Sequence, residues 1–182
     1  MTGRYGAGKG EVAAYLQTKG FGYFSFSEQI GEECRKRNLQ ETRENLISIA
    51  NEFRSKFGND YWARKIISKM DNSRDYVIES FRNPGEVRAF QGMPGFRLVL
   101  VEAPQRLRFE RTMKRQRKAD FKGFSEFKKF DGQETKNKDK LAQQLVECAA
   151  MAGLKIVNNG TLEELHKKID AMIGELSVGK QE

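Results

Sequence analysis

The sequence predicts an α/β fold with three layers, in which helices cover both faces of a mainly parallel sheet. Helical and extended segments alternate along the chain, with buried strands expected at 76–79 and 97–102. Near the start, Gly3-Arg4-Tyr5-Gly6-Ala7-Gly8-Lys9 matches G-x-x-x-x-G-K and leads into a helix expected at 11–18. A glycine-rich loop of this spacing before a helix is typical of a phosphate-binding loop in such a fold.

Hydrophobic periodicity and capping residues predict the other elements. A short aromatic strand at 22–26 precedes a helix that we expect Ser27 to cap, and Thr42 with Asn45 opens another helix. Further helices are expected at 60–69, from Pro84, from Pro104 to about Arg117, at 139–151 and at 161–176, with a last strand at 154–157.

The length suits one domain over residues 1–182. The stretch 118–140 is polar and rich in Lys and Gly, and it predicts a mobile, lid-like insert at about 115–140. Only Met1 and Thr2 precede Gly3, although a phosphate-binding loop normally follows a central strand. Losing that strand would leave two unpaired sheet edges. We therefore expect a fragment of a longer protein or an unusual numbering.

Composition excludes several classes of function. The single histidine, His166, and the distant Cys34 and Cys148 allow neither a zinc site nor a Ser-His-Asp triad. No apolar run is long enough to cross a membrane and no secretory signal opens the chain, so a cytoplasmic protein with reduced cysteines is expected. The net charge of +8 indicates an anionic partner, whether nucleic acid, a membrane surface or a polyphosphate.

The glycine-rich loop carries the strongest functional signal. Glycines let the backbone turn its N–H groups around phosphate oxygens, and the helix N-terminus and Lys9 add positive charge. We expect the phosphates of ATP to bind on Gly3, Gly6, Ala7, Gly8, Lys9, Gly10 and Glu11, with Lys9 also taking part in catalysis. The alternative is a glycine-rich turn with a chance lysine.

The residue after Lys9 departs from the general pattern. Gly10 stands where a Ser or Thr hydroxyl would bind Mg²⁺, and Glu11 follows it. Mg²⁺ would then be held by water and by carboxylates elsewhere. This departure weakens the case for catalysis more than the case for nucleotide binding.

Further motifs give the chain a family resemblance. They are Phe24-Ser25-Phe26-Ser27, Thr42-Arg43-Glu44-Asn45-Leu46, Val77-Ile78-Glu79-Ser80-Phe81-Arg82, Arg108-Phe109-Glu110-Arg111 and Val157-Asn158-Asn159-Gly160. With the loop, they make the chain resemble P-loop nucleotide kinases related to CMP and AMP kinases, of the dephospho-CoA-kinase-like group, over nearly its whole length. The motif Gly-Arg-Tyr-Gly-Ala-Gly-Lys-Gly also resembles the loop of P-loop domains that precede a zinc-dependent deoxycytidylate deaminase.

The resemblance implies a nucleoside-monophosphate-kinase-like fold with a lid insert, and acceptor-binding helices at 27–70. Glu79 would hold Mg²⁺ through water, or else is a solvated strand-end carboxylate. Arg82 would grip the acceptor phosphate and act in catalysis, or else lies on the surface. Arg43 and Arg54 would contact the acceptor, or else pair with Glu44 or Glu52.

Two more groups follow from the resemblance. Arg108, Arg111 and Arg115 share one helix face, and this stretch leads into the lid; Arg111 and Arg115 would neutralise the transferring phosphoryl group. A basic solvated helix is the alternative, and Asp120 would brace the lid. Asn158 and Asn159 would lie near the adenine edge, or else form a turn that caps the helix from Thr161.

Three functions compete at this point. The first is a kinase that transfers the γ-phosphoryl group of ATP, with Mg²⁺, to a nucleotide or a dephospho-CoA-like acceptor. The second is a nucleotide-sensing regulatory domain attached to, or partnering, a deoxycytidylate deaminase, with little kinase activity. The third, a nucleic-acid-binding module, is least favoured because the basic residues alternate with acidic ones and match no nucleic-acid motif.

Overall fold

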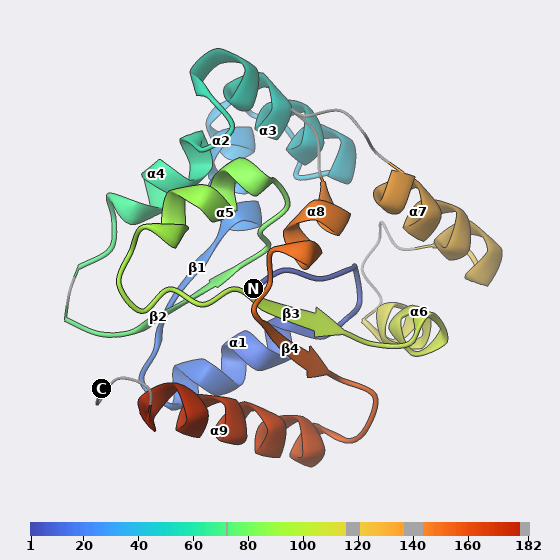
Figure 1. The fold of residues 1–182 in the computed structure, drawn as a ribbon. Coiled ribbons are helices and arrows are strands. Elements are labelled where there is room, and N and C mark those ends of the chain that lie inside the picture. Colours follow the sequence, from blue (N-terminus) through green and yellow to red (C-terminus); the bar gives the residue numbers. More distant parts are fainter. Residues whose placement is uncertain (72, 116–120, 137–143, 179–182) are drawn as a thin grey trace.

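The computed structural model describes residues 1–71, 73–115, 121–136 and 144–178. Its elements follow the order α1 (Lys9–Thr18), β1 (Gly22–Ser25), α2 (Phe26–Lys36), α3 (Arg43–Phe57), α4 (Tyr61–Ile67), β2 (Tyr76–Glu79), α5 (Pro84–Gln91), β3 (Val99–Glu102), α6 (Gln105–Lys114), α7 (Phe124–Lys136), α8 (Leu145–Ala150), β4 (Leu154–Val157) and α9 (Leu162–Val178) (Figure 1).

The strands pair in parallel, as expected. β1 pairs with β2 from Gly22↔Tyr76 to Ser25↔Glu79, and β3 pairs with β4 from Val99↔Leu154 to Glu102↔Val157. Helices make the crossover connections that parallel pairing requires. The carboxyl ends of all four strands therefore lie along one edge, where the loops that follow them meet.

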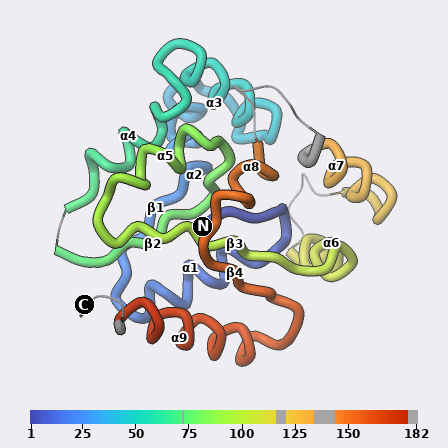
Figure 2. The backbone as a smooth tube through the Cα atoms, in the orientation of Figure 1, coloured from blue at the N-terminus to red at the C-terminus, as the bar shows by residue number. Residues whose placement is uncertain are grey.

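Met1 and Thr2 lie between the two pairs of strands and bond to both. The amide of Thr2 donates to the carbonyl of Val99, and the amide of Val101 donates to the carbonyl of Thr2, each over 2.9 Å. On the other side, the amino group of Met1 donates to the carbonyl of Ile78 over 2.5 Å. Figure 2 shows the N-terminus in the middle of the sheet. The expectation of two unpaired sheet edges was therefore wrong next to the loop. There, Met1 and Thr2 occupy the place of the central strand.

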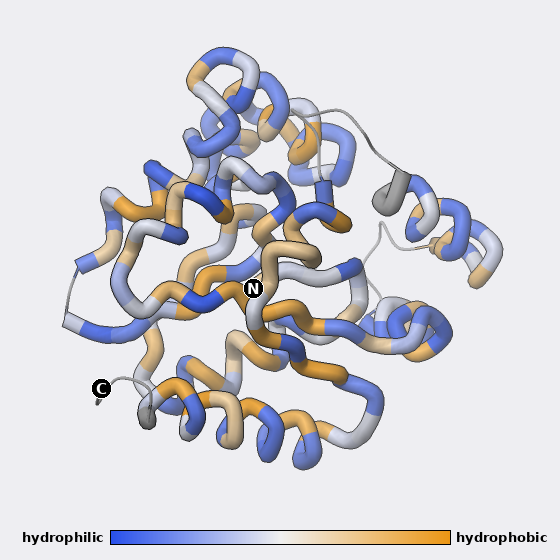
Figure 3. Tube along the Cα trace, in the orientation of Figure 1, coloured by the Kyte–Doolittle hydropathy of each residue, from blue (hydrophilic) through white to orange (hydrophobic). Residues whose placement is uncertain are grey.

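Successive side chains of the strands enter separate apolar cores on the two faces of the sheet. In β2, Val77 packs with residues of α1 and α9, whereas Ile78 packs with residues of α2–α5 and α8. Figure 1 accordingly shows α1 and α9 on one side of the strands and α2–α5 with α8 on the other. Figure 3 shows hydrophobic stretches along the strands between these helices. The predicted three-layer arrangement is therefore confirmed.

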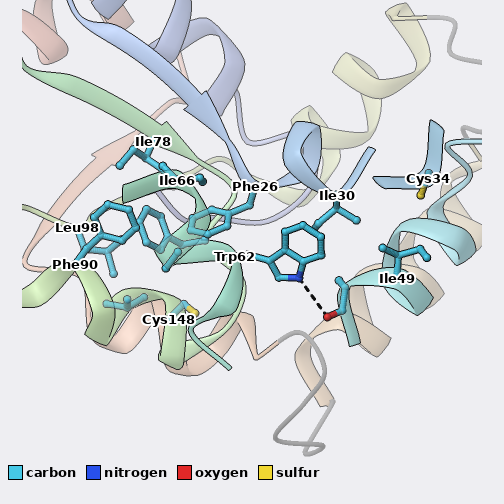
Figure 4. Packing of buried hydrophobic residues seen from close by; sticks show 14 residues of the cluster. Phe26, Ile30, Cys34, Ile49, Trp62, Ile66, Ile78, Phe90, Leu98 and Cys148 are labelled. Atoms are coloured by element: carbon cyan, nitrogen blue, oxygen red, sulfur yellow. Dashed lines mark hydrogen bonds between the residues drawn. The ribbon is translucent and has the colours of Figure 1, made fainter. Parts of the chain in front are cut away.

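Trp62 of α4 is fully buried in the larger core, to which residues of α2 and α3 also belong. Its side chain is fully buried among aliphatic and aromatic residues, and its indole Nε1 donates to the carbonyl of Ala50 over 3.3 Å (Figure 4). The ring thus fills the space between α3 and α4 while its polar atom remains hydrogen-bonded, as a buried tryptophan requires.

The helix starts were predicted with mixed success. Thr42 caps α3 by accepting a hydrogen bond from the amide of Asn45 over 3.2 Å, as expected. Ser27 was a wrong choice of cap, because α2 already begins at Phe26 and Ser27 lies within its first turn. The start of the helix expected at 139–151, and Arg117 and Asp120, lie outside the described residues.

The stretch expected to be a lid-like insert contains a helix that was not predicted. Phe124 and Phe127 of α7 pack against Phe109 of α6, with ring centroids 5.3 and 5.6 Å apart. Phenylalanines spaced by three residues lie on one helix face. Among the described residues, no helix is long and apolar enough to cross a bilayer.

The hydroxyl of Thr2 provides a test of the central link, because it donates to the carbonyl of Phe81 over 3.0 Å and both residues are buried. Thr2→Val keeps the side-chain shape but removes this donor. We expect the free energy of unfolding, measured by urea denaturation, to fall by about 1–3 kcal/mol. The control is Thr18→Val, whose hydroxyl bonds the carbonyl of Tyr15 on the exposed surface. Equal losses in the two variants would contradict a special role for Thr2.

Candidate phosphate-binding site

The backbone of the loop is shaped by its glycines. Gly3 and Gly8 adopt φ angles of 142° and 98°, which residues other than glycine rarely adopt. A Cβ on Gly3 would lie 2.2 Å from the carbonyl oxygen of Val101. A Cβ on Gly8 would lie 2.2 Å from the side-chain nitrogen Nδ2 of Asn158. The loop is therefore pressed against the ends of β3 and β4.

Lys9 extends its side chain back into the loop. Its Nζ donates to the carbonyls of Gly3 over 2.9 Å and Arg4 over 3.2 Å, and the residue is only 7% exposed. Lys9 is also the first residue of α1, whose N-terminus contributes a partial positive charge. The ammonium and the helix N-terminus thus lie together, as an anion-binding loop requires.

Gly10 and Glu11 lie on the outer side of the loop. Among the described residues, apart from the neighbours of Gly10 and the backbone of its own helix, no atom lies within 4 Å of the position that a Cβ on Gly10 would take. Glu11 is exposed, and its Oε1 lies 3.9 Å from a guanidinium nitrogen of Arg115. A hydroxyl at position 10 would therefore fit without steric conflict.

Asn158 connects the loop to α6. Its side-chain amide donates to the carbonyl of Ala7 over 3.0 Å, and its Oδ1 and backbone carbonyl accept from Arg111 over 3.0 and 3.1 Å. The residue is buried. Its amide is thus used to hold Arg111 beside the loop, a role that neither sequence alternative had anticipated.

Asn159 does not cap α9, contrary to the alternative in which Asn158 and Asn159 form a capping turn. Asn159 is exposed and accepts a hydrogen bond from Lys168 over 3.3 Å. Thr161 and Glu164 cap α9 instead, because each side chain accepts from the amide of the other, over 3.2 and 2.9 Å. Asn159 is therefore free of the cap and lies on the surface after β4.

Arg111 and Arg115 lie beside the loop and the start of α1, whereas the charge of Arg108 is paired within the fold. Burial and the neighbouring charge of Arg115 lower the pKa of Arg111. An anion between two such guanidinium groups would relieve their repulsion. Arg108 instead forms a buried bidentate ion pair with Asp131 of α7, with both N–O distances 2.7 Å. The expectation of one stripe of three available arginines is corrected, because a carboxylate from α7 already neutralises the first.

Glu79 ends β2 on the same edge of the sheet. Its Oε2 accepts from the hydroxyl of Tyr23 over 3.1 Å, and burial together with the charge of Glu79 raises the pKa of Tyr23 to about 12. Burial lowers the pKa of the Met1 amino group to about 5, while Glu79 raises it and Lys9 lowers it, so both charges lie near that group. The charges of Glu79 and Lys9 therefore act on the same amino group with opposite effects on its pKa.

The donor set fits a metal that arrives with a nucleotide. Mg²⁺ keeps several waters and takes one or two carboxylates besides phosphate oxygens, and Glu79 supplies one carboxylate near the loop. In the described part of the chain, no group of three or more His, Cys, Asp or Glu residues could hold a metal. The residues therefore fit a water-mediated Mg²⁺ at Glu79 and do not form a cage of their own.

Arg54 is part of a buried ion pair that supports the turn after β2. Its guanidinium lies 2.6 Å from Glu86, and both side chains are almost fully buried. Glu86 also accepts from the backbone amides of Arg82 over 2.9 Å and Asn83 over 3.0 Å. Arg54 therefore holds the backbone that carries the half-buried Arg82.

Arg43 lies in an aromatic cluster made by three parts of the chain. Its guanidinium is 4.8 Å from the ring centroid of Tyr5 in the loop, 3.8 Å from that of Phe130 in α7 and 5.3 Å from that of Phe121. Such distances are typical of cation–π contacts. Arg43 thus joins α3 to the loop and to α7.

Three residues of the site were missed from the sequence: Tyr5, Tyr23 and Asp131. Tyr5 occupies a variable position of the motif, and Tyr23 has no motif around it. Asp131 follows Phe124, Phe127 and Phe130, whose spacing of three was a usable signal for a packed helix.

A cavity of about 670 Å³ lies beside the first half of the loop. Its walls include Gly3, Ala7, Val101, Ala149 and Val157. Neither Lys9 nor Arg111 nor Arg115 lines it. The cavity, whose lining also includes Arg4 and Arg108, is therefore distinct from the surroundings of those three side chains.

Comparisons with known proteins agree with this architecture. A family model described as AAA domain matches residues 1–131. A UPF0200 protein of Thermococcus gammatolerans is 29% identical over 186 residues, which cover 98% of this chain and 95% of the relative. A UPF0200 protein of Methanothermobacter thermautotrophicus is 30% identical over 180 residues, which cover 97% and 89%. Neither name mentions dephospho-CoA or a deaminase.

Two solved structures share the fold. TT1252 from Thermus thermophilus is 18% identical with a TM-score of 0.57, covering 96% of this chain and 95% of its own. A gluconokinase from Sinorhizobium meliloti is 13% identical with a TM-score of 0.56, covering 99% and 93%. At such identities the likeness establishes the fold, an α/β arrangement of the P-loop type, and leaves the substrate open.

Replacing Arg54 tests whether it is structural. Arg54→Met leaves the carboxylate of Glu86 buried without its guanidinium partner, so we expect the free energy of unfolding to fall by about 3–5 kcal/mol. The control Arg64→Met removes an exposed pair with Asp60 at 3.2 Å and should cost less than about 1 kcal/mol. Chemical denaturation measures both. A small loss for Arg54→Met would instead favour a role in ligand binding alone.

Proposed function

This chain belongs to the AAA domain family and to the UPF0200 proteins, and we propose that it is an ATP-dependent kinase. The acceptor would be a small phosphorylated molecule, either a nucleotide or a dephospho-CoA-like compound. One observation carries the proposal: the ammonium of Lys9 lies inside a loop that packs against two strand ends, at the N-terminus of α1.

The described residues suggest how the phosphates of ATP would be held. Lys9 would exchange its bonds to the carbonyls of Gly3 and Arg4 for bonds to phosphate oxygens, and the loop amides would complete the shell. Arg111, held by Asn158, and Arg115 would face the transferring group from α6 and neutralise its developing charge. Mg²⁺, when bound with ATP, would neutralise charge on the β- and γ-phosphates, with Glu79 holding it through water.

The arginines of the acceptor side divide into three roles. Arg54 supports the turn after β2 and Arg43 joins the aromatic cluster, so Arg82 is the residue that we assign to the acceptor phosphate. An acceptor oxygen would attack the γ-phosphorus in line, its bond to phosphorus forming as the bond to the β-phosphate oxygen breaks, and ADP would leave. Arg82 would fix the direction of attack through bidentate bonds to the acceptor.

A nucleotide sensor is the second candidate, favoured by Gly10. No hydroxyl follows Lys9 to bind the metal, so the site would bind a nucleotide and turn it over slowly. A deoxycytidylate deaminase, in the same chain or as a partner, would then respond to the bound nucleotide. An assay of ADP formation with nucleoside monophosphates, deoxynucleotides and dephospho-CoA separates the two candidates, since only the kinase forms ADP in an acceptor-dependent way.

Replacing Lys9 tests nucleotide binding. We expect Lys9→Met to weaken ATP binding about 10-fold or more in calorimetric titration, because a charge-assisted hydrogen bond to phosphate is lost. Lys19→Met is the matched control at the other end of α1, where Lys19 pairs with Asp170 on the surface over 3.0 Å. Equal affinity in wild type and Lys9→Met would refute phosphate binding on this loop.

Adding a hydroxyl at position 10 tests the kinase assignment. The open space around Gly10 accommodates a serine, which would supply the metal ligand that the motif normally has. For a kinase we expect Gly10→Ser to raise kcat several-fold while the affinity for ATP changes little, with Gly10→Ala as the control without the hydroxyl. ATP binding without acceptor-dependent ADP formation in any of these proteins would favour the sensor.

A further inference from the structure

Asp131 lies on α7 and none of the roles assigned so far uses it. The residue is 1% exposed, and besides the bidentate pair with Arg108 it accepts from Gln105 over 2.7 Å and from Arg4 over 3.1 Å. Arg108 and Gln105 belong to α6, whereas Arg4 belongs to the phosphate-binding loop. One carboxylate therefore joins α7 to both elements.

The network reaches the loop by a second route. One of the two Arg108 nitrogens that bond Asp131, Nη1, also donates to the carbonyl of Tyr5 over 3.1 Å. Nε of Arg108 donates to the carbonyl of Ala103, also over 3.1 Å. Asp131 thus orients a guanidinium that bonds the loop backbone. The two adjacent residues Arg4 and Tyr5 are both held from the α7 side, one through its side chain and one through its carbonyl.

The carboxylate keeps its charge in this buried place. Burial alone would raise the pKa of Asp131, but hydrogen bonds from Arg108 and Gln105 and the charges of Arg108 and Arg4 outweigh it and hold the pKa below its usual range. A charged carboxylate forms stronger hydrogen bonds than a neutral acceptor does. The link is therefore fully formed at neutral pH.

Aromatic contacts align with the ionic ones. The ring of Tyr5 packs edge-on against Phe121 and Phe130, with centroids 6.1 and 6.2 Å apart. Phe130 is the residue next to Asp131 on α7. The loop segment Arg4–Tyr5 is thus in contact with α7 through the ion pair of Arg4 with the buried Asp131 and through the edge-on contact of Tyr5 with Phe130.

We propose that Asp131 is a positioning residue that couples α7 to the phosphate-binding loop, so that α7 in this place keeps Arg4 and Tyr5 in the conformation that binds nucleotide phosphates. The proposal rests on the proposed function in that the ligand is ATP. Coupling between two sites is reciprocal, so ATP on the loop also stabilises the placement of α7. α7 is then a reporter of occupancy as well as a support for the loop.

The first test is ATP affinity. We expect Asp131→Asn, which keeps the shape and removes the charge, to raise the Kd for ATP with Mg²⁺ about 5- to 10-fold in calorimetric titration. Glu126→Gln is the matched control, because Glu126 lies on the same helix and loses the same charge, and its one hydrogen bond within the described residues is to the nearby amide of Lys122. An unchanged Kd in Asp131→Asn, or a lower one, overturns the proposal; a lower one would mean that Asp131 merely screens the positive charge of the loop.

A double-mutant cycle separates positioning from simple loss of charge. Arg4→Met also removes a positive charge near the phosphates, which by itself weakens binding. If Arg4 acts through Asp131, its effect on Kd is smaller in the Asp131→Asn background than in wild type. Strictly additive effects of the two substitutions overturn the coupling.

Hydrogen exchange gives a readout that a merely structural role would not move, and it remains usable if Asp131→Asn is less stable. In wild type and Glu126→Gln we expect ATP to slow exchange in 124–133, and in Asp131→Asn we expect this response to be lost. A lower melting temperature with an unchanged response overturns the proposal. If wild type binds no ATP, the proposed function fails. The coupling is then tested without nucleotide, by comparing amide hydrogen exchange of residues 3–10 in Asp131→Asn and Glu126→Gln. Equal exchange rates in the two variants overturn the coupling.

Discussion

The hydrogen bonds of Met1 and Thr2 to the strands on either side are the constraint on which the rest of the structure depends. They join two pairs of parallel strands that share no other ladder in the part of the chain that the structure describes, and they set where Gly3 leaves the sheet. Because Thr2 is fully buried between the two pairs, the loop starts from a fixed point. Its glycines can then approach the ends of β3 and β4 closely enough to turn the chain into α1.

The distribution of positive charge follows from the cost of burying it. A guanidinium removed from water needs a carboxylate partner, and two deeply buried arginines of the described residues have one: Arg54 with Glu86 and Arg108 with Asp131. Arg111 and Arg115 are more exposed and lie beside the loop, where the carboxylate of Glu11 is 3.9 Å from Arg115. Of these four arginines, Arg54 and Arg108 therefore stabilise the fold, and Arg111 and Arg115 are the two that we propose for anion binding.

Much of the fold was predictable because its signals are local. The motif around Lys9, the apolar strands at Val77 and Val99 and the proline before α6 each follow from a few neighbouring residues. The partners of Arg108, Arg54 and Asn158 were not predictable, since each depends on a residue 23 to 151 positions away. For the same reason the sequence placed Arg43 and Arg54 correctly in the helices beyond β1 but could not show that rings surround the first and a carboxylate the second.

The contact between Gly8 and Asn158 also constrains how this chain can vary. A side chain at position 8 has no room while the amide at position 158 reaches the loop, and a shorter residue at 158 would release Arg111 from its place. The two positions are thus bound to one another in any relative that keeps the same geometry. Since the φ angle of Gly8 also disfavours any other residue, we expect such relatives to keep glycine at position 8 together with an amide side chain at position 158.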